Sequence, residues 1–294
     1  MSKIILESIQ MKAIRIHEFG GLDVLKWEDT LRPEPRPHQV LIKVDSAGVN
    51  YADILRRGGN YPGPDLPTSL GLEAAGTVTE VGSEVTGISA GQRVMAMGPG
   101  GQAEYVAVNA NFVFPYPETV DPVQAGGMPI VFLTAYHLLK SRGRMEPGYT
   151  VLVQAGASGV GTIAIQLAKA WGARVIATAS TQEKLDLCWS LGADVTINYT
   201  IHDFEEIVGQ ESGGLGVELV LECVGGPVLE KSVRCVAPYG RLVSYGNASG
   251  TPANLPASDI TTANRTVIGF SIGRSPQGQL DHRAAMAELF PMLA

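Results

Sequence analysis

The sequence predicts an α/β protein of two parts, an all-β unit followed by a doubly wound, mainly parallel sheet. Three observations indicate this fold class. Short alternating apolar runs separated by glycine and proline fill residues 11–108, and strand and helix patterns alternate from about Pro122 onward. A glycine-rich turn joins the first strand of the second part to the helix that follows it.

The composition is that of a globular protein with a large core. The 294 residues are 45% hydrophobic and 17% charged, which is enough to form two domains. A net charge of −7 gives no sequence-wide reason to bind nucleic acid or an anionic membrane. The three cysteines form no CxxC pair, and no secretory leader pattern or apolar run of about 18 residues is evident. We therefore expect a cytoplasmic protein that acts on small molecules.

The first part contains short strand patterns joined by loops. Met11 opens the first pattern, so we expect Met1 to Gln10 to be an extension outside the fold. Prolines in the segment between Thr30 and Pro37 exclude a helix there and favour an extended connection. The predicted strands are Lys12–Ile16, Val40–Val44, Gly76–Val81 and Arg93–Met97.

The second part opens with a predicted helix at Pro122–Leu139 and then alternates strands with helices of about ten residues, which is typical of βαβ units. The predicted strands are Thr150–Val153, Arg174–Thr178, Val195–Asn198, Val217–Cys223 and Arg241–Tyr245. The predicted helices between them are Gly161–Trp171, Gln182–Leu191 and Val228–Val236.

The turn after the first of these strands has the spacing GxxGxG, with glycines at Gly156, Gly159 and Gly161. Such a turn brings backbone N–H groups and a helix N-terminus close to a pyrophosphate. We assign the tight turn to Gly156, the close approach of phosphate to Gly159, and helix packing on the sheet to Gly161. Small residues also occur at strand–helix turns purely for packing. The whole candidate phosphate site is Gly156, Ala157, Ser158, Gly159, Val160 and Gly161.

The end of the next strand indicates which dinucleotide is accepted. A carboxylate there would bind the ribose 2′-hydroxyl of NAD, but the segment ends in Ala179 and Ser180. Lys184 follows four positions later and suits a 2′-phosphate, although a solvated helix lysine is an equal alternative on residue type alone.

Several separate motifs together resemble the quinone oxidoreductase branch of the medium-chain dehydrogenases, including zeta-crystallin-like proteins. The matching stretches are Ala47 to Asp53, Gly71 to Gly76, Gly91 to Val94, Gly101 to Val106, Ala155 to Gly161, Ile197 to Tyr199 and Gly240 to Gly246. The resemblance implies a GroES-like β-rich substrate domain at residues 1–128 and a Rossmann NADPH-binding domain at residues 129–267. It also implies a return to the substrate domain at residues 268–294, truncated relative to the family.

The same resemblance implies roles for individual residues. Asn50 and Thr134 correspond to the family's contacts to the nicotinamide and its carboxamide, and Tyr51 and Tyr61 to either substrate-pocket or wall residues. These four are the candidate catalytic residues. The remaining implied cofactor contacts are Ser180, Lys184, Tyr199, Ser244, Tyr245, Gly246, Asn247, Ser271 and Ile272.

Zinc-dependent relatives place a cysteine and a histidine where this chain has Asn50 and Leu72, and their four-cysteine lobe has no counterpart in Gly98 to Gln102. We therefore expect no metal, and we interpret Glu73 as a structural acid.

The resemblance implies hydride transfer from NADPH to a quinone. Reduction of an α,β-unsaturated carbonyl shares every motif and stays open, as does protonation by Tyr51, Tyr61 or solvent. A nonenzymatic NADPH-binding protein of crystallin-like or RNA-associating type is the alternative from another class. The resemblance also implies a homodimer paired through the strand near Thr266 to Ile272.

Overall fold

The computed structural model describes residues 10–274 and 281–293. The expected N-terminal extension therefore lies outside the described residues, except for Gln10, which begins the first strand. The chain divides into two compact units, one of residues 1–130 and 281–294 and the other of residues 131–280. The sequence interpretation had placed these divisions after residues 128 and 267.

The first unit is built from two small antiparallel sheets. One has the strand order β2-β1-β4 and the other β7-β3-β5-β6-β8. Val40, Ile42, Val78 and Val94, from three strands of the larger sheet, belong to one buried hydrophobic cluster. The strands are β1 (Gln10–Ile16), β2 (Lys26–Leu31), β3 (Gln39–Ser46), β4 (Thr68–Ser69), β5 (Glu73–Val81), β6 (Arg93–Met97), β7 (Tyr105–Asn109) and β8 (Val113–Pro115). The helices are α2 (Tyr51–Arg57), α3 (Pro122–Ala125) and α10 (His282–Leu289), with short 3-10 turns at Leu22–Val24, Ala110–Phe112 and Phe290–Leu293.

The second unit is a six-stranded parallel sheet in the order β11-β10-β9-β12-β13-β14. This order is that of the Rossmann fold, in which the chain reverses direction across the sheet between its first and fourth strands. The strands are β9 (Thr150–Val153), β10 (Arg174–Ala179), β11 (Val195–Asn198), β12 (Val217–Glu222), β13 (Val236–Ser244) and β14 (Thr266–Gly269). The fold class expected from the sequence is thus confirmed.

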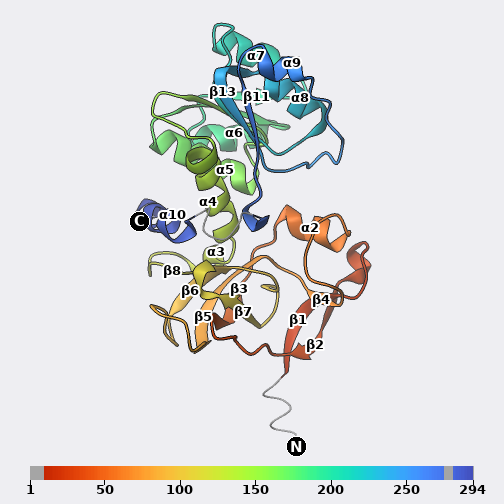
Figure 1. The fold of residues 1–294 in the computed structure, drawn as a ribbon, viewed down its shortest axis with the longest axis vertical. Helices are drawn as coiled ribbons and strands as arrows, with labels where there is room; N and C mark the ends of the chain where they lie inside the picture. The colour runs from red at the N-terminus through yellow and green to blue at the C-terminus, as the bar shows by residue number, and fades with distance from the viewer. Residues whose placement is uncertain (1–9, 275–280, 294) are drawn as a thin grey trace, which may run out of the picture. The chain divides into compact units, whose positions relative to one another are not determined.

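Helices cover both faces of the parallel sheet. Phe204 and Val208 of α7, Val233 of α8 and Ile260 of α9 pack against the same face, and Figure 1 shows these three helices grouped together. The helices of this unit are α5 (Gly159–Ala170), α6 (Gln182–Ser190), α7 (Phe204–Glu211), α8 (Gly226–Arg234) and α9 (Ala257–Thr261), with a 3-10 turn at Ile272–Arg274. The central strands β9, β10 and β12 are almost wholly buried, as expected for a parallel sheet that is covered on both faces.

The segment Pro122–Leu139, predicted to be helical, is divided among three helical pieces. They are α3, then α4 (Pro129–Tyr136), then a π-helix at His137–Arg142. Gly126 ends α3 where a side chain has no room, since a Cβ there would lie 2.4 Å from Ser46 Oγ. Pro129 then opens a new helix, a position that proline suits.

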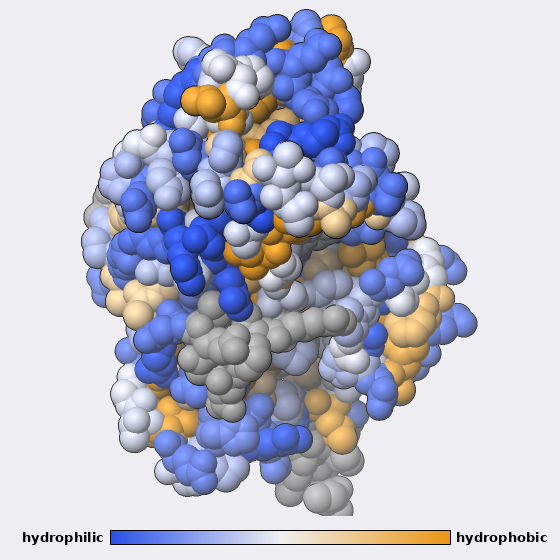
Figure 2. Space-filling model, turned by 45° about the horizontal axis from the view of Figure 1, so that its top comes forward, coloured by the Kyte–Doolittle hydropathy of each residue, from blue (hydrophilic) through white to orange (hydrophobic). Residues whose placement is uncertain are grey.

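The described residues contain no helix long and apolar enough to cross a membrane. On the face drawn in Figure 2, hydrophilic residues predominate and hydrophobic residues form separate groups.

Candidate cofactor and active site

The glycine turn between β9 and α5 leaves backbone donors free. Ser158 caps α5 by accepting the N–H of Gly161 at 3.1 Å. Among the described residues, the N–H groups of Ala157, Gly159 and Val160 have no acceptor. Free N–H groups at the start of a twelve-residue helix form an anion-binding site, because the helix dipole adds positive potential there.

The glycines of this turn have different surroundings. A Cβ at Gly161 would lie 2.5 Å from the carbonyl oxygen of Ala155, and a Cβ at Gly156 would lie 2.9 Å from Cys188 Sγ. Gly159 is exposed, and a Cβ there would approach only Val131 Cγ1, at 3.1 Å. Of the three glycines in this turn, Gly159 is therefore the one that packing within the protein requires least.

The left-handed residue of the turn is Ala155, with φ of 53°, and not Gly156. The tight turn assigned to Gly156 from the sequence is thus made by its neighbour, while Gly156 is confined by the side chains beneath it. Gly161 packs against the carbonyl groups of the turn itself, which differs from the role in sheet packing that we assigned to it.

A buried chain of hydrogen bonds supports the turn from below. Thr178 Oγ1 donates to Gln154 Oε1 at 2.6 Å, and Gln154 Nε2 donates to Ser232 Oγ at 3.0 Å. The N–H of Ala155 in turn donates to Thr178 Oγ1 at 3.3 Å. These three polar side chains are at most 2% exposed. Sequence reasoning missed them, although a glutamine directly after a buried apolar strand was an available signal.

The ends of β10 and β11 carry the residues expected to contact the adenosine 2′-phosphate. Ser180 directly follows β10, and Lys184 lies in the first turn of α6 after its cap, Thr181. Tyr199 follows β11 and donates its N–H to the carbonyl oxygen of Ala179 at 3.2 Å. Lys184 is exposed and has no ion pair with any described residue. The structure therefore brings the ends of these two strands together and leaves the lysine available for an anion.

The carboxyl ends of β12 and β13 form a tightly hydrogen-bonded corner. Glu222 is buried and accepts the N–H groups of Val224 at 2.6 Å and Gly225 at 2.8 Å, while its carbonyl oxygen accepts the N–H of Tyr245. Burial raises the pKa of Glu222. Burial also raises the pKa of Tyr245, whose hydroxyl is inaccessible to solvent. Of the expected contacts Ser244 to Asn247, Tyr245 thus has its hydroxyl turned away from solvent, whereas Gly246 and Asn247 are exposed.

The remaining expected contacts of this unit lie on α4 and after β14. Thr134 is buried on α4, one turn before the π-helix, a helix type that is frequent at functional sites. Ser271 and Ile272 are half-buried and follow Phe270, whose N–H donates to the carbonyl oxygen of Ser244 at 2.8 Å.

In the first unit, Asn50 lies at the start of α2 and belongs to a cluster with two acids. Its N–H donates to Asp53 Oδ2 at 2.8 Å, and its Nδ2 donates to Glu73 Oε1 at 2.7 Å. Glu73 Oε2 accepts the N–H of Ile130, also at 2.7 Å. Burial raises the pKa of Glu73 to about 7, and it raises the pKa of Asp53 as well.

Two tyrosines of this unit were proposed from the sequence as substrate residues. Tyr51 is 53% exposed in the first turn of α2. Tyr61 is half-buried in the loop after α2, where Arg56 donates to the carbonyl oxygens of Tyr61 and Pro64 and lies over the ring of Phe19. The predicted residues thus fall into two sets, one in each unit.

Metal ligands are not assembled near Asn50. Among residues 10–274 and 281–293, no three histidine, cysteine, aspartate or glutamate side chains are grouped so that they could hold a metal ion. Glu73 uses both carboxylate oxygens to accept N–H groups.

Comparison with known proteins identifies the family. The model of the alcohol dehydrogenase GroES-like domain matches residues 36–118, and that of the zinc-binding dehydrogenases matches residues 159–290. The chain is 39% identical to a quinone oxidoreductase of Pseudomonas aeruginosa over 241 residues, which cover 81% of this chain and 74% of that protein. It is 37% identical to a 2-haloacrylate reductase of a Burkholderia species, over 80% of this chain and 73% of that protein.

Another relative is far longer. A phenolphthiocerol/phthiocerol polyketide synthase protein of Mycobacterium tuberculosis is 35% identical over 234 residues, which cover 79% of this chain and only 11% of the synthase protein.

Solved structures show the same fold. The quinone oxidoreductase of Pseudomonas syringae superimposes with a TM-score of 0.91 at 33% identity, covering 96% of this chain and 88% of that one. The Escherichia coli quinone oxidoreductase complexed with NADPH gives a TM-score of 0.89 at 32% identity, covering 96% and 87%.

Proposed function

Because the chain belongs to the medium-chain dehydrogenase/reductase superfamily and, within it, to the quinone oxidoreductase family, we propose that it transfers a hydride from NADPH to a small electron-poor acceptor, first of all a quinone. The observation that carries this proposal is the glycine turn, with its free N–H groups at Ala157, Gly159 and Val160 on the carboxyl side of a parallel sheet.

The residues at the ends of β10 and β11 support NADPH as the donor. No carboxylate ends β10, and Lys184, which has no ion pair with a described residue, can donate a charge-assisted hydrogen bond to a phosphate. Ser180 and Tyr199 provide further hydroxyl groups at the same sheet edge.

When bound, NADPH supplies two electrons and one proton as a hydride. The chain's residues bind the cofactor and the acceptor, orient them toward each other, and exclude water from the reaction. We assign the orientation of the nicotinamide end to Asn50 and Thr134. A second proton must reach the oxygen of the reduced acceptor, and Tyr51, Tyr61 and solvent are the candidate sources. The exposed position of Tyr51 and the partial exposure of Tyr61 suit such a role.

Reduction of an activated carbon–carbon double bond is the second candidate function. The similarity to a 2-haloacrylate reductase favours it, since that relative is nearly as similar as the quinone oxidoreductase. Both reactions need the same donor geometry and differ in the acceptor pocket. We propose that neither needs zinc, because Asn50 and Leu72 offer no thiolate or imidazole.

The test is NADPH consumption with 9,10-phenanthrenequinone, 1,4-benzoquinone, a 2-alkenal and 2-chloroacrylate, with and without a chelator. Turnover of the quinones above that of the alkenes supports the first proposal, and the reverse order supports the second. Tight NADPH binding without turnover of any acceptor would favour a nonenzymatic protein of crystallin-like or RNA-associating type. Loss of activity together with one stoichiometric zinc on chelation would contradict the zinc-free mechanism.

A further inference from the structure

Glu73 accepts a hydrogen bond from the side-chain amide of Asn50, and the proposed mechanism assigns no role to this acid. The carboxyl group is at the start of β5, and the residue is 2% exposed. Its Oε1 accepts Asn50 Nδ2 at 2.7 Å, and its Oε2 accepts the N–H of Ile130 at the same distance. Ile130 lies in the first turn of α4, where backbone N–H groups have no partner within the helix.

The contact between Glu73 and Asn50 needs a glycine at position 48, where a side chain would collide with the carboxylate. A Cβ at Gly48 would lie 2.2 Å from Glu73 Oε1 and 2.7 Å from its carboxyl carbon. Any side chain at position 48 would therefore displace the carboxylate from Asn50. A Cβ at Gly101 would likewise lie 2.4 Å from the carbonyl oxygen of Glu73, so the main chain of this residue is confined as well.

An ionised carboxylate decides which way the amide points. A carboxylate only accepts hydrogen bonds, so it selects the Nδ2 side of the Asn50 amide and turns Oδ1 away from itself. We propose that Glu73 is a positioning residue for hydride transfer, which keeps the Asn50 amide in the single orientation that presents Oδ1 as an acceptor. This inference rests on the proposed function of Asn50 at the nicotinamide.

The charge of Glu73 makes the contact sensitive to pH. Burial raises its pKa to about 7, against the opposing effects of the N–H groups of Ile130 and Asn50, and the charge of Asp53 raises it further. Asp53 on α2 is the titratable neighbour, and it is itself held by the Asn50 N–H. Protonation turns one Glu73 oxygen into a donor and removes the negative charge, which weakens the acceptance of the two N–H groups. The orientation of Asn50 should therefore loosen as the pH falls below about 7.

The first test is the variant Glu73→Gln, whose amide can accept only one of the two N–H groups. We expect kcat with the best acceptor of the panel to fall roughly 10- to 100-fold, because small misplacements of an orienting group have effects of that size. NADPH affinity should change by less than about threefold, since the phosphate contacts lie elsewhere. The decline of wild-type kcat below about pH 7 should be absent in this variant.

The second variant, Gly48→Ala, keeps the acid but displaces it. We expect a similar fall in kcat, and the double variant Gly48→Ala/Glu73→Gln should be no worse than the more impaired single variant, because both act through one contact. Glu218→Gln is the matched control. Glu218 Oε2 also accepts a backbone N–H, that of Thr150 at 2.8 Å, but it lies on β12 outside the proposed site, so its kcat should stay at the wild-type level.

A readout without turnover separates this inference from the proposed function. In protein labelled with ¹⁵N-asparagine, the side-chain amide signal of Asn50, assigned with Asn50→Ala, should shift with a midpoint near pH 7. The shift should be lost in Glu73→Gln and kept in Glu218→Gln. The positioning role would be overturned if the Asn50 amide signal did not change with pH. It would also be overturned if the Glu73→Gln variant were active with the wild-type pH profile. Failure of every acceptor with an intact amide titration would instead refute the proposed function alone.

Discussion

Lys184 and Glu73 carry the two charges on which the proposed chemistry depends most, and their surroundings are opposite. Lys184 is exposed and has no ion pair with a described residue, so solvent stabilises its charge and a phosphate can replace that solvent. Glu73 is buried, and within the described part of the chain its carboxylate accepts the N–H groups of Asn50 Nδ2 and Ile130. Substitutions of the two residues should therefore show themselves in different measurements.

For Lys184→Ala we expect NADPH binding to weaken roughly 10- to 100-fold, because a charge-assisted hydrogen bond contributes about 1.5–3 kcal/mol. NADH has no 2′-phosphate, so its dissociation constant should hardly change. Lys184→Arg keeps the charge and serves as the control. Fluorescence titration with both cofactors gives the ratio of dissociation constants, and equal weakening of both, or of neither, would refute the phosphate contact.

For Glu73 we expect a pH-dependent stability that Glu73→Gln lacks. The folded protein binds this proton more tightly than the unfolded chain, with a pKa of about 7 against 4.5. The stabilisation from protonated Glu73 is therefore complete below pH 4.5 and is lost as the pH rises through 7. From these values, the unfolding free energy of wild type relative to Glu73→Gln should fall by about 3 kcal/mol across that window. Urea unfolding at pH 5, 6, 7 and 8 measures this difference, and a constant difference would contradict it.

At the scale of elements, the glycines of the β9–α5 turn have different surroundings, so substituting them should have different effects. One substitution should affect cofactor binding and another should affect packing. Gly159→Ala adds a methyl group to an exposed helix start, so unfolding free energy should change by less than about 1 kcal/mol. The same methyl group should hinder the pyrophosphate and weaken NADPH binding at least about tenfold. Gly161→Ala is the contrasting variant, since its Cβ would meet two backbone carbonyls and should cost about 1–3 kcal/mol. An unaltered NADPH affinity in Gly159→Ala would exclude the turn as the phosphate site.

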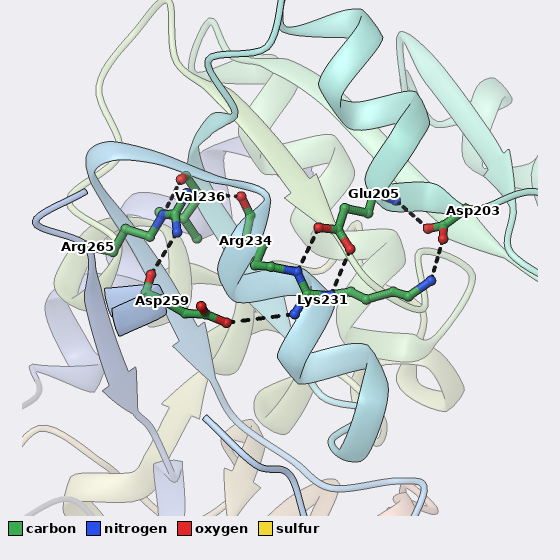
Figure 3. Close-up of polar contacts among 7 residues, drawn as sticks. All are labelled: Asp203, Glu205, Lys231, Arg234, Val236, Asp259 and Arg265. Carbon is green, nitrogen blue, oxygen red and sulfur yellow. Dashed lines mark hydrogen bonds and ion pairs between the residues drawn. The ribbon is translucent and has the colours of Figure 1, made fainter. Parts of the chain in front are cut away.

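A group of polar contacts connects α7, α8 and the segment before β14, as Figure 3 shows. Arg234 pairs with Glu205, and Lys231 with Asp203, but these side chains are all about one-third exposed or more. Solvent screens such ion pairs, so each contributes little to the free energy of unfolding. Arg265 differs, because its guanidinium donates to three carbonyl oxygens, those of Val236 at 2.6 Å, Asp259 at 2.7 Å and Arg234 at 3.1 Å.

We therefore expect Arg265→Lys to cost about 1–3 kcal/mol of unfolding free energy, because an ammonium cannot serve three carbonyl groups in fixed directions. Arg234→Ala should cost less than about 1 kcal/mol. Urea denaturation of both variants gives the comparison, and an Arg234→Ala variant that is less stable than Arg265→Lys would reverse this ranking of the contacts.

At the scale of the whole molecule, sequence periodicity predicts the second unit better than the first. The strand β9 is almost wholly buried and has the short apolar run Val151 to Val153, whereas β2 has mostly exposed and half-buried residues and was missed. The helices α2 and α7 were missed as well, each being only two turns long.

The candidate site divides in the same way. The glycine turn and Lys184 are local motifs and could be found in the sequence. The contact between Asn50 and Glu73 spans 23 positions and depends on how β5 lies beside the start of α2, so spacing alone could not predict it. The chain Gln154, Thr178 and Ser232 was hidden for the same reason, because its members come from three elements.

The outer edge of the parallel sheet leads to the last prediction, which concerns assembly. Among the described residues, β14 pairs with β13 and with no strand on its other side. An unpaired edge strand can pair with its copy in a second molecule, which would satisfy its exposed N–H and carbonyl groups. Since Phe270 donates its N–H to β13, alternation along the strand places the N–H of Val267 and Gly269 on the outer side.

We therefore expect a homodimer at micromolar concentration and a monomer for Val267→Pro, which lacks the outward N–H and is tolerated at a solvent-facing edge position. Val267→Ile keeps the N–H and is the control, and it should remain dimeric. Light scattering gives the masses, and unchanged NADPH affinity of the Val267→Pro monomer shows that the unit is still folded. A wild-type monomer, or a Val267→Pro dimer, would show that β14 is not the interface.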